Sequence, residues 1–107
     1  MKQTEYLYDS SGKWIAFKVG KYLFNTSSDW IGWFPWQDIA VDVEGHYLGT
    51  IFLNNRLLVN LNQPWLPYPG YPGYPGYPEY PGYPGFIGYC GHISNTVDIK
   101  EEKLRGN

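Results

Sequence analysis

The chain has little of what most catalytic and metal sites need. Its 107 residues include one cysteine, Cys90, and two histidines, His46 and His92. One cysteine can form neither an intrachain disulfide nor a multi-cysteine zinc site, and nothing in the sequence brings the histidines together. No nucleophile, base and orienting group can be assembled. We therefore expect no metal, no cofactor and no enzymatic activity.

An excess of charge of one sign is also absent. Eight basic and ten acidic residues leave a net charge of −2, whereas binding to duplex nucleic acid needs a concentrated Lys/Arg face. No apolar run approaches the roughly 18 residues of a membrane-spanning helix, and no apolar segment typical of a signal peptide follows residues 1–5. We expect a protein of the cytoplasm, or one peripheral to a membrane, with no duplex nucleic acid as partner.

Aromatic residues, in contrast, make up 20% of the chain, and many of them recur within a repeated unit. In each copy an apolar run ends in Asp or Asn, and an aromatic residue stands five positions later with Ile or Leu after it. The copies start at intervals of 16, 17 and 18 residues. The Asp or Asn positions are Asp9, Asn25, Asp42 and Asn60, and the aromatic positions are Trp14, Trp30, Tyr47 and Trp65.

Each unit has the pattern of a β-hairpin. The Asp or Asn side chain can bond the backbone two residues on and start a turn, which we favour over a ring of oxygens around a cation. Ala16, Gly32 and Gly49 recur two positions after the aromatic residue and indicate close backbone approach or a bend in the sheet. We predict an all-β fold in which four repeated β-hairpins form a shallow pseudo-fourfold barrel, with no helix between residues 6 and 66.

Residues 7–17 and 30–36, followed by the Tyr-Pro-Gly tail, resemble the four-fold beta-flower family over roughly residues 6–90. The resemblance implies a petal-like barrel of hairpins, similar in outline to that of tubby-like proteins but without their central helix. No established activity accompanies it, and a lipid or membrane role is suggested only by the tubby-like similarity.

From residue 68 the chain repeats the triplet Tyr-Pro-Gly, with Glu79 in place of one glycine. Polyproline II has three residues per turn, so we predict a polyproline-II-like tail with its tyrosines on one face. This tail packs back along the barrel or is exposed as a ligand for partners. The interruption at Glu79 argues against a collagen-like helix.

The predicted organisation is a four-hairpin domain at 1–66, the repeat tail at 67–91 and a polar C-terminal segment at 92–107. Either residues 65–67 or residues 86–89 close the fourth hairpin, and in the second case the tail is an insertion within it. The repeat spacing favours residues 65–67.

Two sets of aromatic residues are candidate sites. The repeated residues Trp14, Trp30, Tyr47 and Trp65 are predicted to line the core or a ligand cavity, and Trp33, Phe34 and Trp36 are predicted to form a loop that contacts a membrane or a partner. The leading hypothesis is a module that binds lipid or an apolar ligand at a membrane surface. The alternatives are a structural or protein-interaction module that displays the tail, and a binder of carbohydrate or single-stranded nucleic acid by aromatic stacking.

Overall fold

The computed structural model describes residues 3–106 as an all-β protein, which confirms the predicted fold class. Strands adjacent in the chain pair antiparallel, and a parallel contact between Tyr8 and Arg56 closes the sheet into a seven-stranded barrel. The strands are β1 (Thr4–Tyr8), β2 (Trp14–Val19), β3 (Tyr22–Asn25), β4 (Trp30–Trp36), β5 (Ile39–Asp42), β6 (Tyr47–Phe52), β7 (Arg56–Asn60) and β8 (Thr96–Asp98).

Three of the predicted hairpins are β1–β2, β3–β4 and β5–β6, here called hairpins 1, 2 and 3. The turn of each is organised by its Asp or Asn side chain. Oδ1 of Asp9, Asn25 and Asp42 accepts backbone N–H bonds from the residues two and four positions on, at 2.9–3.0 Å. A short polar side chain thus satisfies the donors of each turn.

Each of these hairpins has an irregular register at the same place. In hairpin 1, Leu7 faces Ala16 and Tyr8 faces Trp14, so Ile15 is left without an opposite residue. Such a bulge bends the strand and redirects a side chain. Ile15, and the residues left without an opposite partner at the same place in hairpins 2 and 3, are buried together with the strand residues whose side chains face the inside of the barrel. This interior core comprises Leu7, Ile15, Ala16, Leu23, Ile31, Phe34, Ala40, Leu48, Leu57 and Ile99.

A second cluster lies on the opposite face of hairpins 1 and 2, because neighbouring residues of a strand point to opposite faces. We call it the outer cluster. It consists of Tyr8, Trp14, Phe17 and Phe24, with Tyr6, Val19, Tyr22 and Trp30 packed against it.

The fourth hairpin is formed by β7 and β8, with Leu58 opposite Asp98 and Asn60 opposite Thr96. Neither predicted closing segment, 65–67 or 86–89, pairs with β7, so the preference for 65–67 is wrong. Pro64 and Pro67 flank Trp65 and remove the backbone donors that a strand needs. The triplet repeat therefore lies within the connection of the fourth hairpin.

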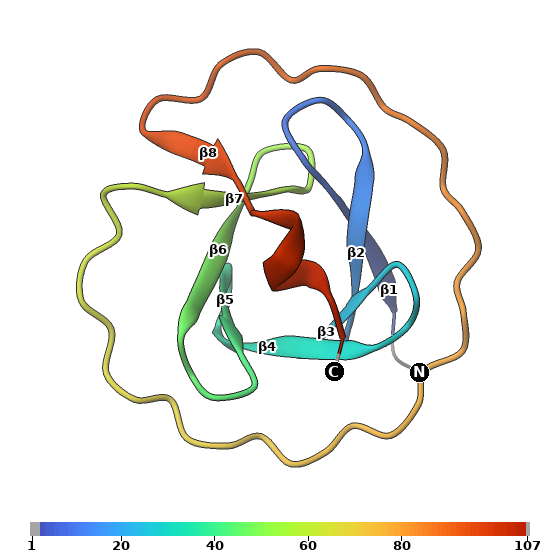
Figure 1. The fold of residues 1–107 in the computed structure, drawn as a ribbon, viewed down its shortest axis with the longest axis vertical. Helices are drawn as coiled ribbons and strands as arrows, with labels where there is room; N and C mark the ends of the chain where they lie inside the picture. The colour runs from blue at the N-terminus through green and yellow to red at the C-terminus, as the bar shows by residue number, and fades with distance from the viewer. Residues whose placement is uncertain (1–2, 107) are drawn as a thin grey trace.

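The C-terminal residues close one end of the barrel. After β8, Ile99 enters the interior core, and Leu104 of the short 3₁₀ helix η1 (Glu101–Leu104) packs against it. Figure 1 shows η1 in the middle of the ring of strands.

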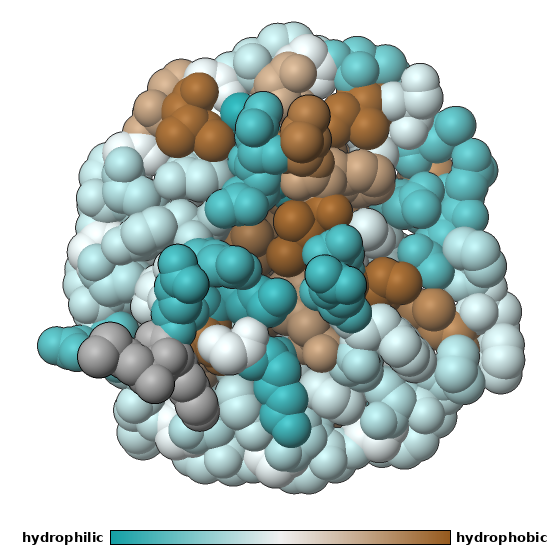
Figure 2. Space-filling model, turned by 180° about the vertical axis from the view of Figure 1, so that it is seen from behind, coloured by the Kyte–Doolittle hydropathy of each residue, from teal (hydrophilic) through white to brown (hydrophobic). Residues whose placement is uncertain are grey.

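The connection from β7 to β8 circles the outside of the strands (Figure 1). We call residues 68–91 the belt. Followed from its N-terminal end, the belt contacts first hairpin 3, near Gly45, then hairpin 2 and last hairpin 1. It therefore passes the hairpins in the reverse of their order in the chain. Seen from behind, pale residues of intermediate hydropathy line the left side and the bottom of the molecule, and hydrophobic residues gather at the centre and towards the top (Figure 2).

The belt differs from polyproline II at its triplet glycines. The triplet glycines from Gly70 to Gly91 have φ between +81° and +91°, whereas polyproline II needs about −75°. A Cβ built on any of these glycines would meet no atom of the described residues within 4 Å. Backbone conformation, not space, is therefore what requires glycine there.

Candidate functional site

The belt is held on hairpin 1 by an aromatic pair, Tyr6 and Trp14. The Trp14 ring lies between those of Tyr80 and Tyr83, with centroids 6.1 and 5.9 Å away. The Tyr6 hydroxyl donates a 2.7 Å hydrogen bond to the carbonyl oxygen of Pro81. The Trp14 indole is oriented by a bond within hairpin 1, to the carbonyl of Ala16.

Hairpin 2 repeats this geometry nine residues earlier in the belt. Trp30 lies between Tyr71 and Tyr74, with centroids 5.9 and 5.7 Å away. The Tyr22 hydroxyl donates to the carbonyl of Pro72 at 3.1 Å, and the Trp30 indole bonds Gly32 as Trp14 bonds Ala16. Three triplets of the belt thus match one hairpin of the barrel.

Hairpin 3 lacks an equivalent site. Ile39 stands where the first two hairpins have tyrosine. Tyr47 replaces the tryptophan, and its hydroxyl bonds Thr50 and accepts the backbone N–H of Asn60 at 2.9 Å. The Tyr47 hydroxyl thus forms hydrogen bonds within the barrel and not with the belt.

The belt is fastened again where β1 meets β7, a region that we call the seam. Arg56 is 3% exposed, and its Nη1 donates to the carbonyls of Asp9 and Gly88 at 3.0 and 2.8 Å. The backbone N–H groups of Ile87 and Cys90 donate to the carbonyls of Gly12 and Ser10. Sequence reasoning did not find Arg56, because a single arginine in a short strand carries no pattern.

Two phenols near the belt have a raised pKa, which favours their neutral form. Burial raises the pKa of Tyr8 above its ordinary value, and a side-chain hydrogen bond with Tyr77 raises that of Tyr74. Between residues 67 and 91 the chain has no Lys, Arg or Asp, and Glu79 is its one acidic residue. The belt is thus an almost uncharged surface.

The 4-fold beta flower protein family matches residues 1–86, which include the barrel strands β1–β7 and most of the belt. The chain belongs to this family. The family is a small β module and is not a known enzyme family. No match was found among curated proteins or among solved structures.

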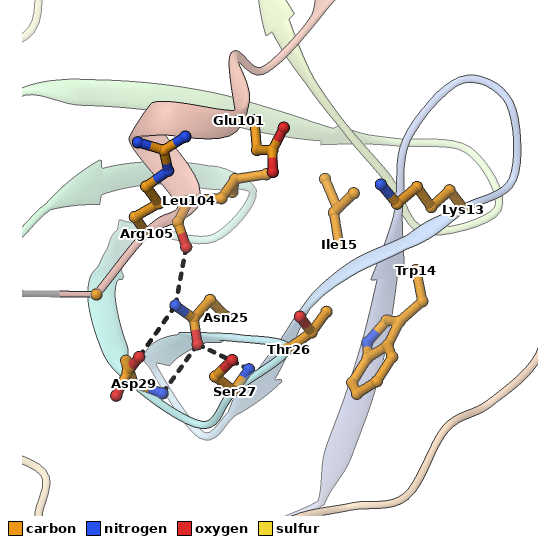
Figure 3. Close-up of a pocket in the computed structure, with 11 residues that line it drawn as sticks. Lys13, Trp14, Ile15, Asn25, Thr26, Ser27, Asp29, Glu101, Leu104 and Arg105 are labelled. Carbon is orange, nitrogen blue, oxygen red and sulfur yellow. Dashed lines mark hydrogen bonds between the residues drawn. The ribbon is translucent and has the colours of Figure 1, made fainter.

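This beta flower has a pocket of about 440 Å³ between the turns of hairpins 1 and 2 and the C-terminal segment (Figure 3). The Asn25 amide donates to the carbonyl of Leu104 at 2.9 Å and so holds that segment over the turn. The pocket is mostly polar and carries both signs of charge. Its lining residues are Lys13, Trp14, Ile15, Asn25, Thr26, Ser27, Asp29, Glu101, Leu104, Arg105 and Gly106.

The four aromatic residues predicted to line a cavity are dispersed in the structure. Trp14 and Trp30 belong to the outer cluster under the belt, and Trp14 also borders the pocket. Tyr47 bonds within the barrel, and Trp65 is 86% exposed. The aromatic positions of the repeat therefore face the belt in the first two units only.

The predicted aromatic loop is wrong, because residues 33–36 belong to β4. Trp33 and Phe34 are buried, and Phe34 lies in the interior core. Pro35 is tolerated because the register with β5 is irregular between Trp33 and Trp36. Of the three residues predicted to contact a membrane or partner, Trp36 is the one that keeps accessible surface.

Residues 3–106 contain neither a cluster of metal ligands nor a membrane-spanning helix. No group of three His, Cys, Asp or Glu side chains there is arranged to hold a metal ion. Within the same residues, no helix has the length and hydropathy to cross a membrane.

Removing single hydroxyls tests how tightly the sites hold the belt. Tyr6→Phe is expected to lower the free energy of unfolding by about 1 kcal/mol, because the carbonyl of Pro81 loses its 2.7 Å donor. Tyr68→Phe is the control, since its ring is 74% exposed and surface changes of this kind stay within about 0.5 kcal/mol. Urea denaturation measures both. Equal stability of the two variants would mean that the Tyr6 bond does not hold the belt.

Proposed function

We propose that this protein is a non-enzymatic protein-interaction module whose contact surface is the outward side of the belt. The observation that carries the proposal is a belt whose backbone is bonded to the barrel while its tyrosine side chains stay exposed. The belt is bonded to hairpins 1 and 2 and to the seam, yet its tyrosine rings remain between 56% and 91% exposed.

A surface of this kind favours protein contacts. Tyrosine offers a large contact area with few rotatable bonds, and a backbone that is already ordered lowers the entropy lost on binding. Because Glu79 is the one charge between residues 67 and 91, we expect recognition by stacking, with weak dependence on salt. The proposal places the module in the cytoplasm, where its free Cys90 remains reduced.

Lipid binding is the second candidate, because tyrosine and tryptophan suit the membrane–water interface. Burial of Trp33 and Phe34 removes most of the contact predicted for it. A lipid surface would have to meet Trp36 and the belt instead.

A comparison of peptides and vesicles tests the proposal. The full chain is titrated with proline-rich, arginine-rich and acidic peptides, and floated with phosphatidylcholine–phosphatidylserine vesicles. The triple variant Tyr68→Ser, Tyr77→Ser, Tyr89→Ser removes rings that contact neither Trp14 nor Trp30. Leu53→Ser is the matched control, since Leu53 is 83% exposed in the turn between β6 and β7.

We expect wild type and Leu53→Ser to bind one peptide class and the triple variant to bind it at least about tenfold more weakly, a loss of about 1.4 kcal/mol. Peptide binding that the triple variant keeps, or no peptide binding at all, contradicts the proposal. Flotation that is lost in the triple variant alone would assign the belt to a membrane.

A further inference from the structure

We propose that the pairs Tyr6–Trp14 and Tyr22–Trp30 are recognition sites for Tyr-Pro-Gly segments, and that they bind the belt of a second copy of this chain as well as their own. These sites face the barrel side of the belt. The inference is therefore independent of what the outward rings contact.

Each site contacts only groups that every triplet supplies. A tryptophan ring meets two tyrosine rings three residues apart, and a phenol bonds the carbonyl of the proline between them. The second site makes the same contacts with the belt nine residues earlier. The barrel therefore recognises the Tyr-Pro-Gly triplet itself, wherever that triplet lies in the chain.

The belt's own register is set outside the two sites. Glu79 takes the place of a triplet glycine between the segments at residues 71–74 and 80–83, and it keeps a negative φ. A slip of one triplet would move it to a position like that of Gly76 or Gly82, where φ is +81° or +87°. A non-glycine residue is strained at such a φ. Glu79 and the seam therefore hold the register, whereas the sites accept any triplet.

A second copy is the occupant that this chemistry indicates. Its belt carries the sequence that the sites already hold, and two belts do not repel each other because residues 67–91 contain no basic residue and one acidic residue. A thirteen-residue stretch, residues 71–83, fills both sites at once, which strengthens binding by linkage. Where one copy gives its belt to the sites of the next, the contact is head-to-tail and can extend, whereas two copies that exchange belts reciprocally close as a dimer.

The chain's own belt competes with the partner, since a tethered segment has an effective concentration in the millimolar range. A variant that vacates the sites removes this competition. We choose the full chain with Tyr71→Ser, Tyr74→Ser, Tyr80→Ser and Tyr83→Ser, which leaves the barrel, β8 and η1 unaltered. The probe is a synthetic peptide of residues 71–85, and the control peptide has serine at the same four tyrosines.

Binding is followed by the NMR signals of the Trp14 and Trp30 indole N–H groups. We expect the vacated variant to bind the peptide saturably, with shifts at both indoles, and to ignore the control peptide. Wild type should bind the same peptide at least about tenfold more weakly, because its sites are filled. A folded variant that does not bind the peptide at millimolar concentration, or binds both peptides equally, overturns the inference.

If the fourfold variant does not fold, Tyr80→Ser with Tyr83→Ser vacates the hairpin 1 site alone. The peptide should then shift the Trp14 indole and leave the Trp30 indole unchanged, and no shift at Trp14 would overturn the inference. Because Tyr68, Tyr77 and Tyr89 are intact in both variants, the result is separable from failure of the proposed contact surface.

Discussion

Gly32→Ala is expected to destabilise the barrel by about 3 kcal/mol or more. A Cβ at this position would lie 2.1 Å from the carbonyl oxygen of Val41 and 3.1 Å from Cδ1 of Leu48. The oxygen cannot move aside easily, because β4 and β5 pair at Gly32–Asp42 and at Trp33–Val41. Urea denaturation followed by tryptophan fluorescence measures the loss.

The repeat supplies matched controls for this substitution. Hairpin 1 has Ala16 at the equivalent place, fully buried, so Ala16→Gly should cost only about 0.5–1 kcal/mol. In hairpin 3 a Cβ on Gly49 would meet Ile99 Cδ1 and the Leu58 carbonyl at 3.0 Å, which predicts an intermediate loss for Gly49→Ala. A Gly32→Ala protein as stable as Ala16→Gly would contradict the close-approach argument.

These three positions also illustrate what the sequence could predict. The Asp or Asn turn, the aromatic residue five positions later and the small residue after it are local signals repeated in register. They were sufficient for the first three hairpins and for the all-β class, since a hairpin is specified by residues near each other in the chain. The prediction of close approach at Gly32 and Gly49 likewise rested on residue size alone, and the structure confirms it.

The wrong predictions concern partners that are distant in the chain. β8 pairs with β7 across the whole triplet repeat, and the short segment Thr96–Asp98 carries no aromatic residue of the repeat pattern. Spacing therefore pointed to Trp65, whose flanking prolines exclude a strand. Pro35 led to the opposite error, a loop predicted where the structure has a strand. An irregular register between β4 and β5 accommodates this proline inside β4, and the sequence contains no sign of that irregularity.

The candidate site was predicted in part. A belt packed along the barrel was one of the alternatives that the triplets left open, but its path depends on a match of nine belt residues to one hairpin, which appears only in three dimensions. The positive φ of the belt glycines could not be predicted either. Glycine adopts positive and negative φ about equally readily, so the sequence alone does not select one of them.

Arg56→Met is expected to open the seam and to lower the free energy of unfolding by about 3 kcal/mol. The guanidinium is the shared donor to the carbonyls of Asp9 and Gly88. Its loss leaves the Gly88 carbonyl of the belt without this charged donor, whereas the Asp9 carbonyl keeps the backbone N–H of Gly12. Methionine retains much of the side-chain volume. The buried Nε of Arg56 has no hydrogen-bond partner among residues 3–106, so its removal offsets a little of this loss.

Arg105→Met is the matched control, because it makes the same change of charge at an exposed residue on the rim of the pocket. Its stability should stay within about 0.5 kcal/mol of wild type. The reactivity of Cys90 provides a second measurement, since its backbone N–H is bonded to Ser10 at the seam and its thiol is partly buried. An aromatic disulfide reagent should modify Cys90 faster in Arg56→Met than in Arg105→Met. Equal thiol rates, together with a lower stability of Arg56→Met, would mean that Arg56 supports the barrel without fastening the belt.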